Sequence, residues 1–210
     1  TGILADLHFA PTETAKNNLI RENKKKENIF VVGNTVIDAL LSTVKENYRF
    51  ADKEIEDIEE HKRVILVTTH RRENLGTPMH HVYKALRRLV ETVPHTEVVF
   101  PVHRNPLVRE AVEEELEGVP GIHLVEPMEY EPFTNLMARS SIVLTDSGGI
   151  QEEAPSLGKP VLVLRDTTER PEAIEAGTVK LVGTDENLIY ETAYRLLTDK
   201  KAYDAMSEAV

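Results

Sequence analysis

The sequence predicts an α/β protein built on a doubly wound, open parallel sheet, and two features of the chain support this fold class. From Val64 onward, short apolar runs typical of strands alternate with stretches whose apolar residues have helical spacing. The strand-like runs, such as residues 64–69 and 160–164, are apolar almost throughout. Strands of this kind are buried on both faces, as in a parallel sheet that is covered by helices on each side.

The expected strands and helices alternate along residues 63–210. Strands are expected at residues 64–69, 98–102, 122–125, 142–145, 160–164 and 178–182. Helices are expected at residues 79–92, 105–116, 133–138, 150–157, 172–176, 187–197 and 201–209. The helix at 79–92 shows the spacing clearly, because Val82, Leu86 and Leu89 fall on one face. Pro106 is well placed for the first turn of the next helix, where proline is tolerated.

Residues 1–62 have a different character, and we expect them to be the exit or crossover segment from a missing N-terminal domain. The chain opens with Thr1 rather than Met, which favours a preceding part of the protein. The elements expected here are strands at 7–10 and 29–32, a helix at 14–22, and a helix from about residue 35. The strongly charged residues 51–62 are expected to form an exposed helix and loop. Residues 63–210 then form the C-terminal domain.

The composition is that of a globular protein and limits the classes of function. Hydrophobic residues make up 40% of the 210 residues, and charged residues make up 29%. The formal net charge of −11 argues against a binder of nucleic acid or of anionic membranes, although a local cationic site can still hold a small anion. No apolar run approaches the roughly 20 residues of a membrane span, and no signal peptide is recognisable. A cytoplasmic location is therefore expected.

Several kinds of cofactor and covalent chemistry are not supported by the sequence. The chain has no cysteine, so disulfides, thiolate catalysis and cysteine-ligated zinc are excluded together. It contains neither G-x-G-x-x-G nor G-x-x-x-x-G-K-[ST], the motifs of dinucleotide sites and of P-loop ATPases. We expect no cofactor and no metal site.

The strongest local motif lies at the end of the strand at 142–145. Ligands of doubly wound sheets bind beyond the carboxyl ends of the strands, and here Ser147, Gly148 and Gly149 open a helix. The glycines let a ligand approach the backbone, free N–H groups at a helix start attract phosphate, and the serine adds a hydroxyl donor. Glu153, about one turn into the helix, can accept both hydroxyls of a ribose. A helix cap with a tight turn explains the same residues about equally well.

Basic residues follow three other strands of the predicted sheet. His70 could transfer a proton, and Arg71 beside it could bind phosphate through paired N–H groups. His103 follows the strand at 98–102, and Arg170 lies in the loop after the strand at 160–164. Ordinary alternatives are ion pairs of the arginines with neighbouring glutamates and a helix cap beside His103. Because all these residues share one sheet edge on an acidic chain, they favour a phosphorylated ligand.

Six blocks of this sequence resemble the non-hydrolysing UDP-N-acetylglucosamine 2-epimerases. They are HFAPT (8–12), GNTVIDAL (33–40), THRREN (69–74), PVHRNP (101–106), TDSGGIQEEAPSLGKPVLVLRDTTERPE (145–172) and EAGTVKLVG (175–183). The similarity covers nearly the whole chain. It implies one Rossmann-like half of a two-domain, glycosyltransferase-B-like architecture with the active site between the halves. It also implies interconversion of UDP-GlcNAc and UDP-ManNAc through 2-acetamidoglucal, for surface polysaccharide precursors.

The resemblance assigns roles to the residues at the sheet edge. Ser147, Gly148 and Gly149 are expected to hold the UDP phosphates, Glu153 the ribose, and Arg170 the nucleotide. His70 is expected to assist the loss of UDP as a catalytic residue. Arg71 and His103 match positions at which many bacterial members bind a second, activating UDP-GlcNAc. A homodimer is expected for the full-length protein.

The chain departs from the family pattern in length, because the N-terminal domain with its acid–base residues for C2 is missing. The fragment is therefore expected to bind UDP without epimerising. Three alternatives remain open: a hydrolysing epimerase that releases ManNAc and UDP, a UDP-sugar glycosyltransferase, and a nucleotide-sugar-binding module. The HRREN and TTERPE blocks argue against the glycosyltransferase.

Overall fold

The computed structural model describes residues 3–168 and 171–209, and its contacts divide the chain into two compact units. The first unit ends at Thr43, and the second begins at Val44. Residues 44–62, which the sequence groups with the first segment, make most of their contacts with the second unit. The derivation of residues 1–62 from a preceding domain stays a prediction.

The second unit contains a sheet of six parallel strands in the order β5-β4-β3-β6-β7-β8. The strands are β3 (Arg63–Thr68), β4 (Thr96–Pro101), β5 (Ile122–Val125), β6 (Ile142–Thr145), β7 (Val161–Val163) and β8 (Val179–Leu181). The predicted fold class, a doubly wound parallel sheet with helices on both sides, is confirmed. The central neighbours β3 and β6 are far apart in sequence, because the chain first builds the sheet outward through β4 and β5 and then returns.

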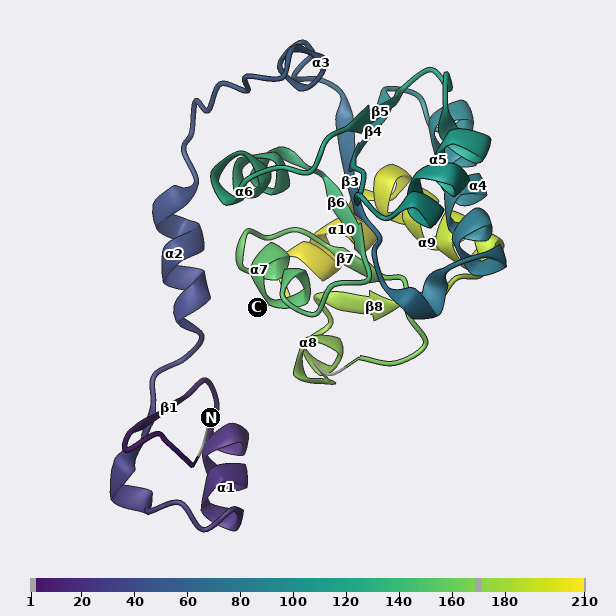
Figure 1. Cartoon of the computed structure of the whole chain (residues 1–210). Coiled ribbons are helices and arrows are strands. Elements are labelled where there is room, and N and C mark those ends of the chain that lie inside the picture. The colour runs from purple at the N-terminus through teal and green to yellow at the C-terminus, as the bar shows by residue number, and fades with distance from the viewer. Residues whose placement is uncertain (1–2, 169–170, 210) are drawn as a thin grey trace. The chain divides into compact units, whose positions relative to one another are not determined.

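Helices cover both faces of this sheet (Figure 1). On one face lie α4 (Thr77–Thr92), α5 (Pro106–Leu116) and α9 (Glu186–Thr198); α4 contacts both α5 and α9, and α10 (Lys200–Ser207) contacts α9. On the other lie α6 (Tyr130–Arg139), α7 (Ile150–Ser156) and α8 (Pro171–Ala176). The remaining elements of this unit are two short helices, α3 (Lys53–Glu56) and the 3₁₀ turn η2 (Arg72–Asn74).

Burial on both faces explains why the central strands are apolar along most of their length. Ile65 and Val67 of β3 belong to the cluster formed with α4, α5 and α9. Val64 and Leu66, which alternate with them along the strand, are buried as well. Successive side chains of a strand point to opposite faces, so each strand needs apolar residues at every position. Leu86 of α4 is completely buried in the same cluster.

Residues 51–62 differ from the exposed helix and loop that their charge predicts. The helix α3 has only four residues, and Ile55 and Ile58 are buried. Arg139 of α6 donates hydrogen bonds to the carbonyl oxygens of both isoleucines. Burying these two side chains anchors the segment, because apolar burial outweighs the preference of the surrounding charges for water.

The first unit contains the short elements that the sequence predicts. They are β1 (His8–Ala10), α1 (Glu13–Arg21), β2 (Ile29–Val31) and α2 (Thr35–Thr43), and the 3₁₀ turn η1 (Lys26–Asn28) occurs in addition to them. The two strands are parallel, and the rings of Phe9 and Phe30 stack with centroids 5.8 Å apart. Both rings are largely exposed, at 64% and 46%, so this sheet buries little apolar surface by itself.

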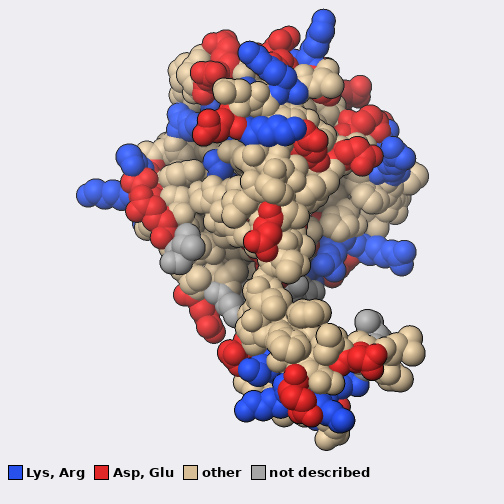
Figure 2. Space-filling model, turned by 90° about the vertical axis from the view of Figure 1, so that its left-hand side faces the viewer, with Lys and Arg blue, Asp and Glu red and all other residues tan. Residues whose placement is uncertain are grey.

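Acidic and basic side chains are interspersed over the face of the molecule shown in Figure 2, without a broad basic area. This distribution agrees with the formal net charge of −11. Among the helices of the described residues, none combines the length and apolar character that a bilayer crossing requires.

The α4 interface with the sheet is expected to dominate the stability of the second unit. Leu86→Ala should lower the free energy of unfolding by about 2–5 kcal/mol, because it removes a buried side chain and leaves a cavity. Urea denaturation measures the change. Leu107→Ala on α5 is the matched control, since Leu107 is 56% exposed and its loss should cost within about 0.5 kcal/mol. Equal losses for the two variants would contradict the assigned core.

Candidate functional site

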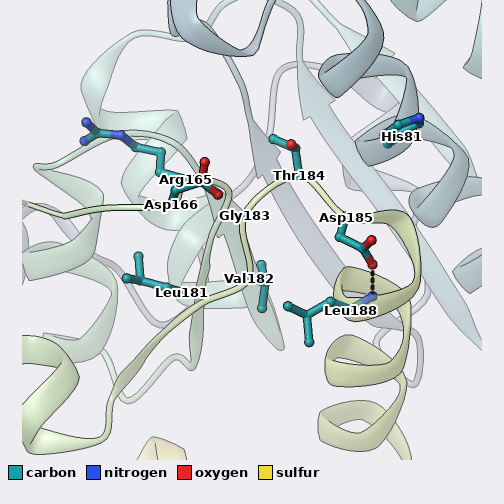
Figure 3. A pocket seen from close by; sticks show the side chains of 9 residues that line it. All are labelled: His81, Arg165, Asp166, Leu181, Val182, Gly183, Thr184, Asp185 and Leu188. Carbon is teal, nitrogen blue, oxygen red and sulfur yellow. Dashed lines mark hydrogen bonds between the residues drawn. The ribbon is translucent and has the colours of Figure 1, made fainter.

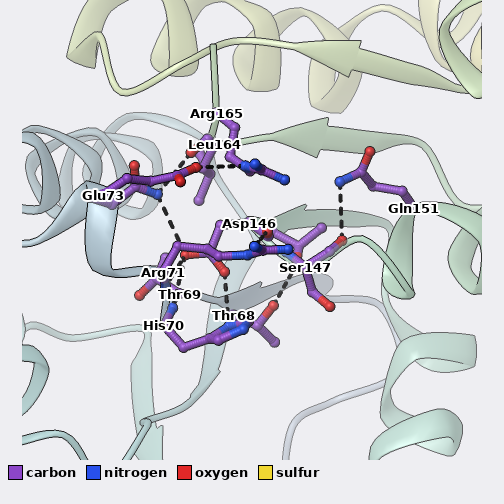
Figure 4. A network of polar contacts seen from close by, with 12 residues as sticks. Thr68, Thr69, His70, Arg71, Glu73, Asp146, Ser147, Gln151, Leu164 and Arg165 are labelled. Carbon is purple, nitrogen blue, oxygen red and sulfur yellow. Dashed lines mark hydrogen bonds and ion pairs between the residues drawn. The ribbon is translucent and has the colours of Figure 1, made fainter. Parts of the chain in front are cut away.

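The carboxylate of Asp146 lies between the ends of the two central strands. The strand order reverses at β3 and β6, and in doubly wound sheets this switch point is where ligands bind. Asp146 follows β6 directly and is completely buried. Its Oδ2 accepts the backbone N–H groups of His70 at 2.9 Å and Arg71 at 2.8 Å (Figure 4). The side-chain amide of Asn74 approaches the same oxygen at 3.4 Å.

The imidazole of His70 is held by the other oxygen of this carboxylate. Nδ1 of His70 lies 2.9 Å from Oδ1 of Asp146, which receives no hydrogen bond from another described residue. The hydrogen bond that His70 donates to Asp146 raises the pKa of His70, against the opposing effects of partial burial and of Arg71. The His70 side chain is 41% exposed. Its Nε2 has no hydrogen-bond partner among the described residues and can meet a ligand.

Asp146 itself is kept ionised by its donors. Burial alone would raise the pKa of its carboxyl, but the hydrogen bonds from the His70 side chain and from two backbone N–H groups lower it below its ordinary value. A buried carboxylate with several donors is a fixed negative charge, so it can orient a histidine without exchanging protons in the neutral range.

Arg71 and His103 lie beside His70, so three residues predicted from separate strand ends are adjacent. The rings of His70 and His103 stack with centroids 5.9 Å apart and an angle of 28° between their planes. Nδ1 of His103 accepts the backbone N–H of Asn105 at 3.1 Å. Nε of Arg71 donates to the backbone oxygen of Asp146 at 3.3 Å.

The loop that carries Ser147 is built on buried polar contacts. The N–H of Ser147 donates to Oγ1 of Thr145 at 3.0 Å, and that hydroxyl contacts Oγ1 of Thr68 at 2.6 Å across the two central strands. Gln151 is completely buried, and its amide donates to the backbone oxygen of Ser147 at 3.2 Å. The same amide accepts the hydroxyl of Thr168 at 2.5 Å, which ties the loop after β7 to α7.

Gly149 adopts ordinary helical backbone angles, with φ −66° and ψ −42°. A side chain is therefore not excluded by the backbone, and a Cβ atom would meet only Oε1 of Glu153, at 3.8 Å. Because these angles suit any residue, a tight turn does not explain why a glycine stands at this position. Lack of a side chain leaves open space over the start of α7.

Glu153 offers a carboxylate that has no hydrogen-bond or ion-pair partner among the described residues. The residue is half-buried. Burial, followed by the charge of Glu152, raises the pKa of its carboxyl. A carboxylate in this state gains from hydroxyl donors of a ligand, because they replace the water that it has lost.

The comparisons with known proteins agree over the whole length of the chain. Residues 1–210 match the sequence family described as UDP-N-acetylglucosamine 2-epimerase. The chain belongs to this family.

Individual members of the epimerase family are close in sequence and in fold. The UDP-N-acetylglucosamine 2-epimerase of Bacillus subtilis is 57% identical over 209 residues, which cover 100% of this chain and 54% of that protein. A Listeria monocytogenes structure assigned to the same enzyme has a TM-score of 0.92 at 50% identity and covers 100% of this chain and 55% of its own. An S. aureus MnaA structure with UDP has a TM-score of 0.90 at 49% identity, over 99% of this chain and 56% of its own.

This chain therefore spans about half the length of the epimerases that it matches. The structure brings together His70, Arg71 and His103, and it puts the Ser147 loop directly after Asp146. Arg170, the remaining predicted residue, lies outside the described residues. Arg165, which precedes Arg170 in sequence, is 7% exposed. Its Nε donates to Glu73 at 2.7 Å, so the two side chains form an ion pair within the protein.

Apart from this cluster, a hollow lies at the ends of β7 and β8 in this member of the epimerase family (Figure 3). It has a volume of about 530 Å³ and is lined by residues such as His81, Asp166, Thr184 and Asp185. Asp185 is already engaged, because its side chain accepts the N–H of Leu188 at 2.8 Å as the cap of α9. Among the described residues, no group of three His, Asp or Glu side chains is arranged as metal ligands would be.

Sequence reasoning missed the supporting residues of this site. It gave Asp146 no role of its own and did not single out Gln151 or Asn74, although all three are buried polar side chains. The available signal was a carboxylate directly after an apolar strand, at the position where ligands of this fold bind.

His70 is expected to stabilise the folded chain more at low pH than at high pH. Because its pKa is raised above the unfolded value of roughly 6.5, its contribution is full below that value and is lost as the pH rises through the folded-state pKa. His70→Asn should therefore lower the free energy of unfolding more at about pH 5.5 than at about pH 8.5. Urea denaturation at both pH values measures the loss of unfolding free energy. Thr68→Ala is the control, because threonine does not titrate in this range. A larger loss at the higher pH would contradict the ion pair.

Proposed function

We propose that this chain is the C-terminal, nucleotide-binding half of a non-hydrolysing UDP-GlcNAc 2-epimerase. The main support is the cluster at the switch point, where His70 and Arg71 are held by Asp146 directly beside the Ser147 loop. A phosphate ligand needs such donors at a helix start. Membership of the epimerase family supplies the substrate, UDP-N-acetylglucosamine.

The proposed reaction begins with elimination. The bond between C1 of the sugar and the UDP oxygen breaks, C2 loses its proton, and UDP and 2-acetamidoglucal form. UDP then adds back to C1 while the opposite face of C2 receives a proton, which gives UDP-ManNAc. The groups that move the C2 proton are expected in the N-terminal half of the enzyme.

The nucleotide is proposed to lie over the start of α7. Ser147, Gly148 and Gly149 would donate to the phosphates, and the partner-free carboxylate of Glu153 would accept the ribose hydroxyls. Arg170 would add positive charge at the nucleotide. The open space over Gly149 supports this arrangement, because a phosphate could approach the backbone without meeting a side chain.

His70 is proposed to stabilise the leaving UDP. Negative charge grows on the β-phosphate as the bond to C1 breaks, and a donor at that place stabilises the transition state more than the substrate. The raised pKa of His70 supports this role, since it favours the protonated, donating imidazole at neutral pH.

Arg71 and His103 are proposed to bind a second UDP-GlcNAc that activates the enzyme. Their contacts with His70 and Asp146 support a site next to the catalytic one. The full-length protein is proposed to be a cytoplasmic homodimer that supplies surface polysaccharide precursors, as the family resemblance implies.

The chain alone is expected to bind UDP weakly and to form no UDP-ManNAc. The phosphate loop and Glu153 are present, but the opposing wall of the cleft is not part of these 210 residues. Calorimetry with UDP at up to millimolar concentration tests the binding, and absence of any signal would contradict the site. Product formation by the chain alone would contradict the need for a second half.

Fusion of the chain behind the N-terminal part of the B. subtilis relative is expected to restore conversion of UDP-GlcNAc. The product identifies the enzyme class. UDP-ManNAc supports the non-hydrolysing epimerase, free ManNAc with UDP would indicate the hydrolysing reaction, and a transferred sugar would indicate a glycosyltransferase. Binding without turnover in an otherwise folded fusion would favour a binding module.

Glu153→Ala is expected to weaken UDP binding through the ribose. A hydrogen bond to a charged group is worth about 1.5–3 kcal/mol, so losing two such bonds should cost at least tenfold in Kd. The matched control is the ligand 2′,3′-dideoxy-UDP, which should bind the wild-type chain and Glu153→Ala with similar affinity. The ribose role is refuted when wild type binds UDP and dideoxy-UDP equally well.

His70→Asn is expected to lower kcat of the active fusion by about 10²–10⁴-fold, with a smaller effect on KM. The reason is that the lost donor acts on charge that develops only as UDP leaves. Steady-state kinetics and the melting temperature separate the possible roles. Unchanged turnover with a lowered melting temperature would reduce His70 to a structural cap, and a rise in KM alone would make it a binding residue.

A further inference from the structure

The roles proposed so far leave the carboxylate of Asp146 unexplained. It is completely buried and follows β6 at the centre of the sheet edge. Every donor around it belongs to the segment after β3: the backbone N–H groups of His70 and Arg71, the amide of Asn74, and Nδ1 of His70. Capping the loop would need only Oδ2, which already takes both backbone N–H groups.

The second oxygen has a different partner. Oδ1 is buried, faces Nδ1 of His70 at 2.9 Å, and receives no hydrogen bond from another described residue. A buried carboxylate oxygen is costly unless it is paired, so this contact fixes the proton of His70 on Nδ1. Nε2 is then the nitrogen that meets the ligand, as a donor in the imidazolium form.

We propose that Asp146 is a positioning residue for the epimerase reaction, which orients the imidazole of His70 through Oδ1 and the backbone of His70 and Arg71 through Oδ2. The inference rests on the proposed function of His70. One carboxylate thereby orients the imidazole that donates to the leaving phosphate and also fixes the backbone from which the side chain of Arg71 extends. Asp146 remains ionised and takes no proton during the reaction.

The groups that act on His70 come from three strand ends. Asp146 favours its protonated form, while Arg71 opposes it with a like charge. His103 stacks on its ring. Removing the charge of Asp146 while keeping its shape should therefore shift the titration of His70 to lower pH.

Two-bond ¹H–¹⁵N NMR of the histidine ring in this chain tests the orientation without any need for enzyme activity. In wild type, neutral His70 should carry its proton on Nδ1, which is the minor form of a free histidine. Asp146→Asn should lower the pKa of His70. Thr145→Val is the matched control: Thr145 is buried next to Asp146 and its hydroxyl bonds to Thr68 and Ser147 rather than to His70, so the titration should keep its wild-type position.

The wild-type spectrum alone can overturn the proposal, which keeps it testable even if Asp146→Asn fails to fold. A neutral His70 with its proton on Nε2 would refute the assigned orientation. An unchanged titration in folded Asp146→Asn would refute the charge effect.

Kinetics of the active fusion tests whether Asp146 acts through His70. Asp146→Asn should lower kcat by up to the factor found for His70→Asn, and the double variant should be no slower than His70→Asn alone. If the losses of kcat in the two single variants multiplied in the double variant, Asp146 would act independently of His70, and the proposal would be overturned. If His70→Asn left turnover unchanged while the NMR results held, the proposed function of His70 would fail and the orientation by Asp146 would stand.

Discussion

The ion pair between Asp146 and His70 joins the two halves of the doubly wound sheet at the point where they meet. One half of the sheet runs outward from β3 and the other from β6, and their carboxyl ends diverge beyond the last paired residues, Thr68 and Thr145. A loop that left β3 without a partner there would have unsatisfied N–H groups in a partly buried place. The carboxylate supplies the acceptors, so the loop after β3 and the Ser147 loop keep a fixed relation.

The fold of the second unit could be predicted because its signal is local and repeated. The central strands are apolar along most of their length, and they alternate with helices that have an apolar face, so the alternation specifies a covered parallel sheet. Residues 51–62 could not be predicted in the same way. Their charge indicated exposure, while Ile55 and Ile58 are buried and their carbonyl oxygens are bound by Arg139, which is far away in sequence.

The site was predictable up to the contacts between strands. The rule that ligands lie at strand ends selected His70, Arg71 and His103, and the structure brings all three together. The rule does not say that β3 and β6 are neighbours. That adjacency decides the pairing of Asp146 with His70, so a carboxylate that had no role of its own in the sequence analysis is the partner of the predicted catalytic residue. Glu153 needed no such information, because its place one turn into α7 is local.

The amide of Gln151 has a consequence for how this protein can change shape. One side chain holds the backbone of Ser147 with its nitrogen and the hydroxyl of Thr168 with its oxygen, inside a fully buried position. Thr168 cannot move away from Gln151 without breaking this hydrogen bond. Through Gln151, a displacement of Thr168 bears on the backbone of Ser147, and a displacement of the Ser147 backbone bears on Thr168.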